Sequence, residues 1–304
     1  MYVNLDERKI RNRNIFSKSS LILDDGLLFK IPIKENSRYL IKNSLNIFLY
    51  ENLVNFNKNK KYILSENILE TYSDDIKNLP NITHNGLILP KNENLFSYNM
   101  LFSSIVDQFV SLDIINHIDK IQFPINIRLQ DGTPNSIKDS RPRSTTKLHT
   151  DIWSGDTGFL AILAILGDTN KAGIDFHLQD NFKKKYVQTL DDYEIGESLV
   201  KNTRQIIKLN KQGWFIADSY VLHQTKKKGN ALRVSIDFRF TPKLKIDSDI
   251  QATKERDKFF LDKDTWLQIG KKKLIHTNDN FSTIRDRDKK YNTGYMVDIN
   301  LIDL

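Results

Sequence analysis

The chain has 304 residues, of which 39% are hydrophobic and 10% aromatic, and its formal net charge is +8. This composition predicts a globular protein with a sizeable core and argues against a disordered chain. The sequence contains no cysteine, which excludes disulfides, thiolate metal sites, iron–sulfur clusters and a cysteine nucleophile.

The positive charge comes largely from short, scattered lysine runs. Such runs are typical of solvated loops, although they can also attract an anionic substrate, and they lack the concentrated basic face of a nucleic-acid-binding protein. The longest apolar run, Phe159 to Leu166, is too short to cross a bilayer, and residues 1–20 do not resemble a signal peptide. We therefore expect a soluble, cytoplasmic protein with no membrane or nucleic-acid partner.

The first third of the chain has helical periodicity in two segments. Apolar residues recur at near-helical spacing over residues 38–56 and, more regularly, over residues 97–119. These segments predict helices that cover one side of a core.

The middle of the chain changes to strand periodicity. Residues 121–130 alternate between apolar and polar side chains, and Phe159 to Leu166 is a continuous apolar run that predicts a strand buried on both faces. Further strands are predicted at 174–179, 206–209, 214–222 and 232–240. Many short strands after helices indicate an antiparallel sandwich or barrel with a helical flank. The last 60 residues turn polar and partly helical, for example over 252–269.

The polar side chains of the first strand have two interpretations. Asn126, Arg128 and Gln130 share one face of the segment 121–130. If the oily face packs against the predicted helices, the polar face lines a wet cavity and can contact substrate or co-substrate. If the strand lies at an edge, the same face is solvated.

Two separate segments supply candidate metal ligands. His149 and Asp151 are two residues apart, so on a strand their side chains project to the same side. A glycine at position 213 leads into an apolar strand that ends at His223. An imidazole pair with one carboxylate can bind iron(II) and leave three coordination positions open.

An arginine follows the distal histidine by ten residues. Arg233 and Ser235 share one face of the strand 232–240, and the apolar residues between them share the other. A guanidinium in a cavity can bind a carboxylate through two parallel hydrogen bonds, and a hydroxyl nearby can add a third. This pair suits the distal carboxylate of a dicarboxylate such as 2-oxoglutarate.

In this order, H-x-D, a distal histidine and R-x-S, the pattern resembles the iron(II)/2-oxoglutarate-dependent dioxygenase superfamily over roughly residues 120–240. The stretch from Leu148 to Gly155 is distantly similar to its phytanoyl-hydroxylase and clavaminate-synthase side. The resemblance implies an α+β protein with a double-stranded β-helix (jelly-roll) core. It also implies Fe(II) on His149, Asp151 and His223, and 2-oxoglutarate on Arg233 and Ser235.

We expect one domain overall, with an N-terminal helical or mixed cover over 1–119, the catalytic core over 120–240 and a polar helical C-terminal extension over 241–304. Lys147, two residues before His149, and His177, on the polar face of its strand, are further candidate pocket residues.

The implied function is an oxygenase that consumes O2 and hydroxylates a small polar or anionic metabolite, such as a sugar, an amino acid or a nucleotide conjugate. Asp151 argues against a halogenase, which needs a small residue in place of the carboxylate ligand. Two alternatives stay open: a cupin-type nucleotide-sugar isomerase or epimerase, and a non-enzymatic jelly-roll module that binds carbohydrate.

Overall fold

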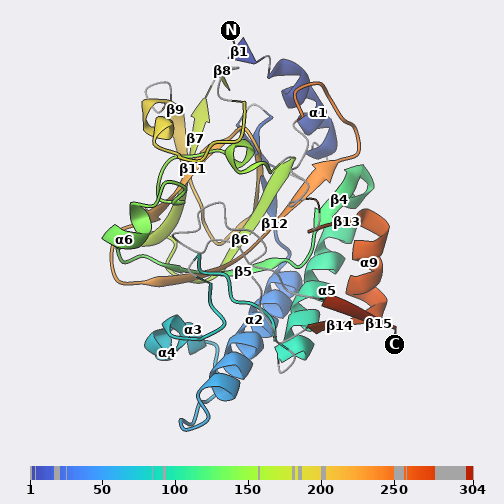
Figure 1. Ribbon diagram of the computed structural model, residues 1–304. Helices are drawn as coiled ribbons and strands as arrows, with labels where there is room; N and C mark the ends of the chain where they lie inside the picture. The colour runs from blue at the N-terminus through green and yellow to red at the C-terminus, as the bar shows by residue number, and fades with distance from the viewer. Residues whose placement is uncertain are drawn as a thin grey trace.

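The computed structural model describes residues 2–3, 5–16, 21–24, 26–83, 85–91, 94–156, 158–179, 182–183, 187–199, 203–249, 257, 259–277 and 299–303. Over these residues it combines helices with antiparallel sheets, as the sequence predicted (Figure 1). The helices are α1 (Asp6–Phe16), α2 (Glu35–Phe56), α3 (Ile68–Thr71), α4 (Ser73–Lys77), α5 (Leu95–Ser111), η2 (Ile114–His117), α6 (Ser136–Asp139), η3 (Asp151–Ser154), α7 (Ile195–Leu199) and α9 (Lys263–Lys272). Within this part of the chain, no helix is long and apolar enough to cross a membrane.

A large sheet has the strand order β13-β4-β12-β6-β10-β3-β2, and β5 also pairs with β12. These strands are β2 (Leu21–Asp24), β3 (Leu28–Pro32), β4 (Ile118–Gln122), β5 (Asn126–Asp131), β6 (Phe159–Gly167), β10 (Gly213–Asp218), β12 (Leu232–Pro242) and β13 (Phe260–Asp262).

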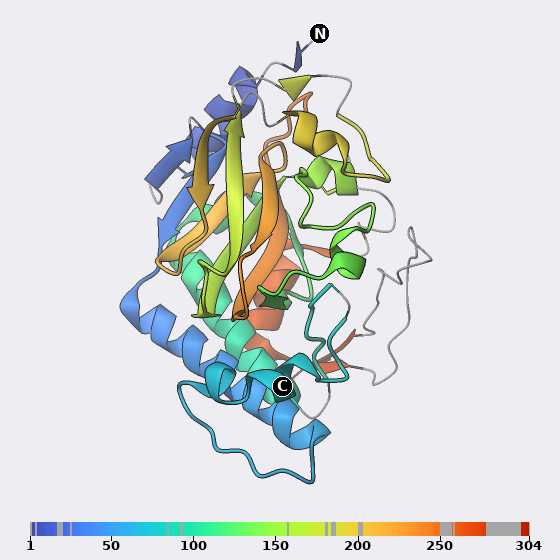
Figure 2. The ribbon, with the colours of Figure 1, turned by 90° about the vertical axis from the view of Figure 1, so that its left-hand side faces the viewer.

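A small sheet has the order β11-β7-β9, formed by β7 (Ala172–Gln179), β9 (Thr203–Lys208) and β11 (Leu222–Lys227). Figure 2 views the molecule from the side of this sheet. Two separate pairs complete the strands: β1 (Tyr2–Val3) with β8 (Phe182–Lys183), and β14 (Lys273–Thr277) with β15 (Ile299–Asp303). From β6 to β12 the chain passes back and forth between the large and the small sheet.

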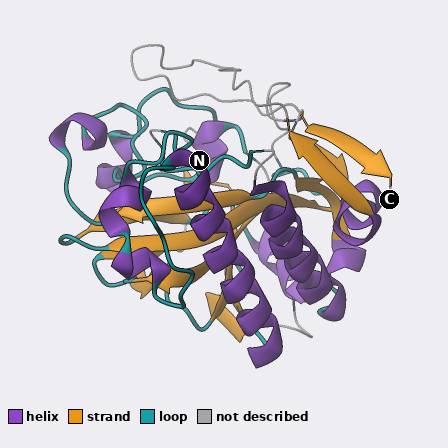
Figure 3. Cartoon of the chain, turned by 90° about the horizontal axis from the view of Figure 1, so that it is seen from below, coloured by secondary structure: helices purple, strands orange, loops and turns teal. Residues whose placement is uncertain are grey.

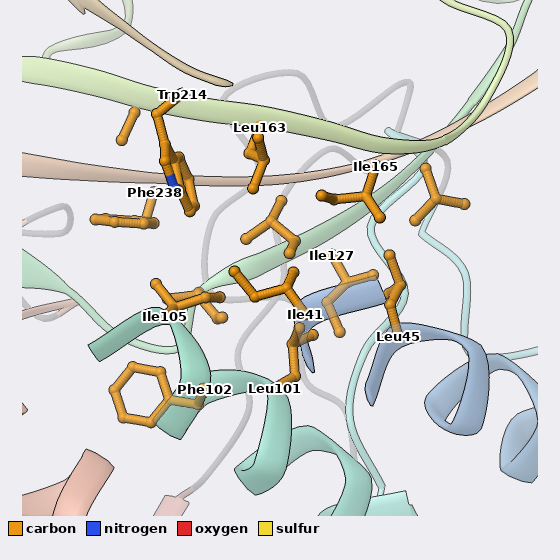
Figure 4. Close-up of a cluster of buried hydrophobic side chains, with 14 of the residues drawn as sticks. Ile41, Leu45, Leu101, Phe102, Ile105, Ile127, Leu163, Ile165, Trp214 and Phe238 are labelled. Atoms are coloured by element: carbon orange, nitrogen blue, oxygen red, sulfur yellow. The ribbon is translucent and has the colours of Figure 1, made fainter. Parts of the chain in front are cut away.

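The central strands β6 and β10 of the large sheet are buried on both faces, which explains their long apolar runs. On β6, Leu163 and Ile165 pack with α2 and α5 in one core cluster, whereas Ile162 and Ala164 belong to a second cluster that includes Phe176 of the small sheet. Figure 4 shows the first cluster, in which side chains of α2 and α5 meet those of β5, β6, β10 and β12. In Figure 3, seen from below, these helices lie against the strands.

The strand predicted over 121–130 is two strands. β4 ends at Gln122 and β5 begins at Asn126, and the Phe123–Pro124 peptide between them is cis. Pro124 has no N–H to donate to a sheet, so strand pairing is interrupted there. The alternation of apolar and polar side chains in the sequence continues through the interruption and does not reveal it. In the C-terminal part, the predicted helical stretch 252–269 is β13 followed by α9, and residues 252–256 and 258 lie outside the described residues.

Candidate metal and carboxylate site

The three predicted metal ligands lie together between the sheets. The ring centroids of His149 and His223 are 4.3 Å apart, and Nε2 of His223 is 3.9 Å from Oδ1 of Asp151. All three side chains are buried. The backbones of the two histidines form an antiparallel bridge, with N–H to O distances of 3.0 and 2.8 Å, which adds the His149 segment to the edge of the small sheet beside β11.

The H-x-D segment is not the regular strand that was predicted. His149 forms a single bridge, and Asp151 begins the short 3-10 helix η3. Thr150 between them is nevertheless extended, with φ −118° and ψ 156°. One extended residue is enough to turn the side chains at i and i+2 to the same side. His149 and Asp151 therefore lie together as predicted, although they do not belong to a regular strand.

His223 does not end the strand that starts at Trp214, as predicted, but is the second residue of the next one. β10 ends at Asp218, whose Oδ1 accepts a hydrogen bond from the N–H of Tyr220 at 3.0 Å. An aspartate that caps its own turn in this way ends a strand, although the residues after it are apolar. The turn transfers the chain from the large sheet to the small one.

The N-terminal helix α1 holds this turn. Arg8 pairs with Asp218 at 3.0 Å and with Asp249 at 2.7 Å, and Arg11 pairs with Asp249 at 2.6 Å. Asn12 donates a further hydrogen bond to Asp218 Oδ2 at 2.8 Å. Nothing in the local sequence pattern indicates this buried network, since its members are more than 200 residues apart.

Both histidines present the nitrogen that a metal would need. Nδ1 of His149 is 2.8 Å from the carbonyl oxygen of Lys147, and Nδ1 of His223 is 3.0 Å from that of Val221. A ring nitrogen beside a carbonyl oxygen must carry the proton, so these contacts assign the Nδ1–H tautomer to both rings. In the neutral ring, Nε2 then keeps its lone pair, as in metal-binding histidines whose other nitrogen is held by a hydrogen bond.

Burial, followed by the neighbouring His223, lowers the pKa of His149 to about 3. The ring is thus neutral at pH 7 without any bound metal. Its contribution to folding is complete above the unfolded pKa of about 6.5 and is lost as the pH falls towards 3.

We expect the free energy of unfolding to fall by about 2 kcal/mol between pH 6.5 and 4.5 on account of His149 alone. The measurement is urea unfolding of the metal-free protein at several pH values, compared with the His149→Gln variant. Asp151 and other carboxylates act at lower pH and are common to both proteins, so the difference isolates the histidine. Equal slopes in the two proteins would contradict a buried neutral imidazole.

Asp151 is held by an arginine that the sequence interpretation did not connect with it. Arg239 donates from Nη2 to Oδ1 of Asp151 at 2.9 Å and from Nε to Oδ2 at 3.3 Å, and it also pairs with Asp156 at 3.2 Å. Burial alone would raise the pKa of Asp151, but Arg239 and then His223 hold it below its ordinary value. The sequence does indicate that Arg239 shares a strand face with Arg233. It does not indicate that Arg239 pairs with Asp151.

The predicted carboxylate clamp is fully buried. Arg233 and Ser235 are both 0% exposed on the inner face of β12, whereas Val234, Ile236 and Phe238 pack on the other face with the helices. The guanidinium of Arg233 makes one hydrogen bond, from Nη1 to the carbonyl oxygen of Ala172 at 2.9 Å. Its Nε and Nη2, and Oγ of Ser235, have no hydrogen-bond partner among the described residues.

The other charges along this face of β12 are paired. Asp237 accepts hydrogen bonds from Asn126 and from Arg128, both at 2.8 Å, so these two predicted pocket residues are engaged across the β5–β12 pair. Arg128 and the buried surroundings act together on Arg233: burial, followed by repulsion from Arg128, lowers its pKa to about 9. Arg233 is therefore still a cation at pH 7. Asp237 acts on it only at longer range, and no carboxylate within the described part of the chain forms a hydrogen bond with it.

The remaining candidates lie elsewhere. Gln130 donates to the carbonyl of its neighbour Asp131 at 3.0 Å, and Nζ of Lys147 pairs with Asp192 at 2.9 Å. His177 lies opposite Leu222, whereas His223 lies opposite Phe176, so His177 occupies the other face of the small sheet and contacts Gln224 at 3.1 Å. The structure does not bring these three residues together with the metal candidates.

Over the described residues, no group of three or more His, Asp or Glu side chains is placed so that all of them could hold one metal ion. Both oxygens of Asp151 face Arg239. The donor set itself suits a divalent ion of intermediate softness: two neutral imidazole nitrogens and one ionised carboxylate. A metal bound here would share the Asp151 carboxylate with Arg239.

No family model matches the chain, and no curated protein matches it. Among solved structures, it is similar to the non-heme alpha-ketoglutarate-dependent carbocyclase SnoK from nogalamycin biosynthesis, with 10% identity over 80% of this chain and 95% of that one and a TM-score of 0.40. It is also similar to the non-heme alpha-ketoglutarate-dependent epimerase SnoN from the same biosynthesis, with 12% identity over 76% of this chain and 83% of that one and a TM-score of 0.36. For the non-heme monooxygenase ThoJ, the identity is 11% over 82% of this chain and 84% of that one, and the TM-score is 0.35.

Proposed function

We propose that the protein is an iron(II)- and 2-oxoglutarate-dependent oxygenase. His149, Asp151 and His223 hold the iron, and Arg233 with Ser235 holds the distal carboxylate of 2-oxoglutarate. The observation that carries this proposal is the buried guanidinium of Arg233. Among the described residues, its Nε and Nη2 and the hydroxyl of Ser235 have no hydrogen-bond partner. A buried cation without a counter-charge is costly, and a bound carboxylate offsets that cost.

The strand arrangement supports the same proposal. β5, β12, β6 and β10 are neighbours in one sheet, and the His149 segment, β11, β7 and β9 are neighbours in the other. Such an exchange of consecutive strands between two four-membered layers is what a double-stranded β-helix requires. It places the histidines on one sheet and the arginine on the other, with the site between them.

The protein's residues have distinct tasks in this proposal. The two imidazoles would bind the iron through Nε2 and Asp151 would bind it through one oxygen, so that co-substrate and O2 could also reach it. With 2-oxoglutarate and O2, the iron would supply the oxidising power to attack an unactivated C–H bond. Arg233 and Ser235 orient the co-substrate, Arg239 keeps Asp151 ionised, and the apolar cluster between the sheets excludes water.

We propose hydroxylation of a small polar or anionic metabolite as the reaction, because Asp151 fills the position that a halogenase leaves open. Release of succinate and consumption of O2 distinguish the oxygenase from a cupin-type nucleotide-sugar isomerase or epimerase, which needs neither 2-oxoglutarate nor O2. A carbohydrate-binding module would retain its binding when His223 is replaced by alanine, whereas the oxygenase would lose its metal.

Anaerobic addition of iron(II) and then 2-oxoglutarate to the metal-free protein is expected to produce the visible metal-to-ligand charge-transfer band of the chelate. The band requires the keto and C1-carboxylate oxygens to bind iron, and so it reports the metal and the co-substrate together. The control is the same titration with succinate, which lacks the keto group. Folded protein that gives no band would refute the assignment.

A further inference from the structure

A short loop lies along the H-x-D segment. Residues 190–196, which we call the strap, contact residues 147–153 at four points. The N–H of Leu190 donates to the carbonyl of Trp153 at 3.0 Å, and Asp192 pairs with Lys147 at 2.9 Å. Tyr193 packs on His149. At Gly196 the two backbones approach so closely that a Cβ would lie 1.8 Å from the carbonyl oxygen of Leu148. The strap is therefore seated on this segment over its whole length.

Within the strap, Tyr193 makes an unusually regular contact with a metal candidate. Its ring is stacked on the imidazole of His149 with centroids 4.9 Å apart and planes inclined by only 3°. Tyr193 is 3% exposed. Offset parallel stacking of aromatic rings contributes beyond simple burial of area.

Tyr193 is also held through its hydroxyl and its backbone. Its hydroxyl lies 2.6 Å from Oγ of Ser154 and accepts hydrogen bonds from Arg143 at 3.2 and 3.3 Å. Its backbone N–H donates to the carbonyl of Pro142 at 2.9 Å. Arg143 also donates to the carbonyl of Trp153 in η3 at 3.1 Å. Arg143 therefore joins its own loop both to η3 and to the strap.

The stack supplies a constraint that the hydrogen bond of His149 does not. A single contact from Nδ1 to Lys147 fixes one atom of the imidazole and leaves the ring free to tilt about it. A parallel neighbour fixes the plane. The direction of the Nε2 lone pair depends on both.

We propose that Tyr193 is a positioning residue for His149: the strap holds its ring, and its ring fixes the plane of the imidazole that binds the metal. The metal-binding part rests on the function proposed above, whereas the position of the ring does not. Partners that orient a ligand in this way typically change metal affinity about 10–100-fold when removed.

The test compares three variants by titrating Mn(II) into metal-free protein and measuring free Mn(II) by electron paramagnetic resonance. Tyr193→Leu removes the ring and is expected to raise the Kd for Mn(II) about 10–100-fold. Tyr193→Phe keeps the ring, loses the hydroxyl, and is expected to stay within about threefold of wild type, below the range for a lost orienting partner. Glu66→Gln breaks an exposed ion pair with Lys42, outside both the strap and residues 147–153, and serves as a control with unchanged Kd.

A second measurement needs no metal. In ¹H–¹⁵N spectra of the imidazoles, we expect wild-type and Tyr193→Phe protein to show His149 as one Nδ1–H tautomer. Tyr193→Leu should show averaging between ring states. If wild-type protein binds no Mn(II), the proposed function fails, and these spectra still decide whether Tyr193 positions the ring.

Three results would overturn the proposal. The first is a folded Tyr193→Leu variant with wild-type affinity and spectra. The second is a Tyr193→Phe variant as impaired as Tyr193→Leu, which would assign the effect to the hydroxyl. If Tyr193→Leu does not fold, Tyr193→Met replaces it; failure of both to fold, with Tyr193→Phe folded, would make Tyr193 a packing residue only.

Discussion

Replacing Arg233 with methionine is expected to weaken 2-oxoglutarate binding and at the same time to stabilise the metal-free protein. The guanidinium is buried, charged at pH 7 and without a carboxylate partner over the described residues, so it costs folding free energy that the methionine side chain does not. We expect a gain of about 1–2 kcal/mol after the loss of the one hydrogen bond to Ala172. Loss of the carboxylate contact should raise the Kd for 2-oxoglutarate by about 30-fold or more.

Urea unfolding measures the first effect, and calorimetric titration of 2-oxoglutarate into the Mn(II)-loaded protein measures the second. Arg233→Lys is the matched control: it keeps the charge but not the planar fork, and so it should bind the co-substrate weakly with no gain in stability. A less stable Arg233→Met protein would mean that the arginine is a structural residue with a partner of its own, and the carboxylate clamp would lose its main support.

Arg239→Met, on the same strand face as Arg233 and six residues later, is expected to destabilise the protein. Arg239→Met removes the counter-charge of Asp151, which is buried and receives both of its hydrogen bonds from that guanidinium. Removal of one partner from a buried ion pair costs about 3–5 kcal/mol. The metal site should be lost as well, since the carboxylate is then no longer held in its ionised form.

A double-mutant cycle in urea separates the two roles of Arg239. Asp151→Asn removes one of the two buried carboxylates that Arg239→Met leaves behind, the other being Asp156, so the double variant should recover part of the lost stability. Additive losses from the two substitutions would show that the pair is not energetically coupled, against the geometry.

Periodicity accounts for the parts of the site that depend on a single strand. The inner and outer faces of β12 were predicted from alternation alone, because burial on both sides of the sheet leaves a strand no freedom to slip by one residue. His149 and Asp151 were paired for the same reason. The continuous apolar run, in contrast, could not reveal where β10 ends and β11 begins, because two of the three residues between them, Tyr220 and Val221, are apolar.

The contacts between distant segments were not predictable in the same way. Arg239 pairs with Asp151, which is 88 positions away in the sequence. Tyr193 stacks on His149 from a loop in which no apolar or polar periodicity indicates the contact. The polar face of β5 illustrates the difference. Its orientation followed from the sequence, but its engagement with Asp237 depends on a strand more than 100 residues away.

The network around α1 has a consequence for the order in which the protein assembles. Arg8 and Arg11 emerge first during synthesis, but Asp218 and Asp249 follow more than 200 residues later. Closing so long a loop is slow, and the two guanidiniums remain hydrated until it closes. Because Asp218 forms the turn before His223, docking of the first helix and completion of the candidate site become one late event. A growing chain could therefore complete the candidate site only after Asp218 and Asp249 have been synthesised.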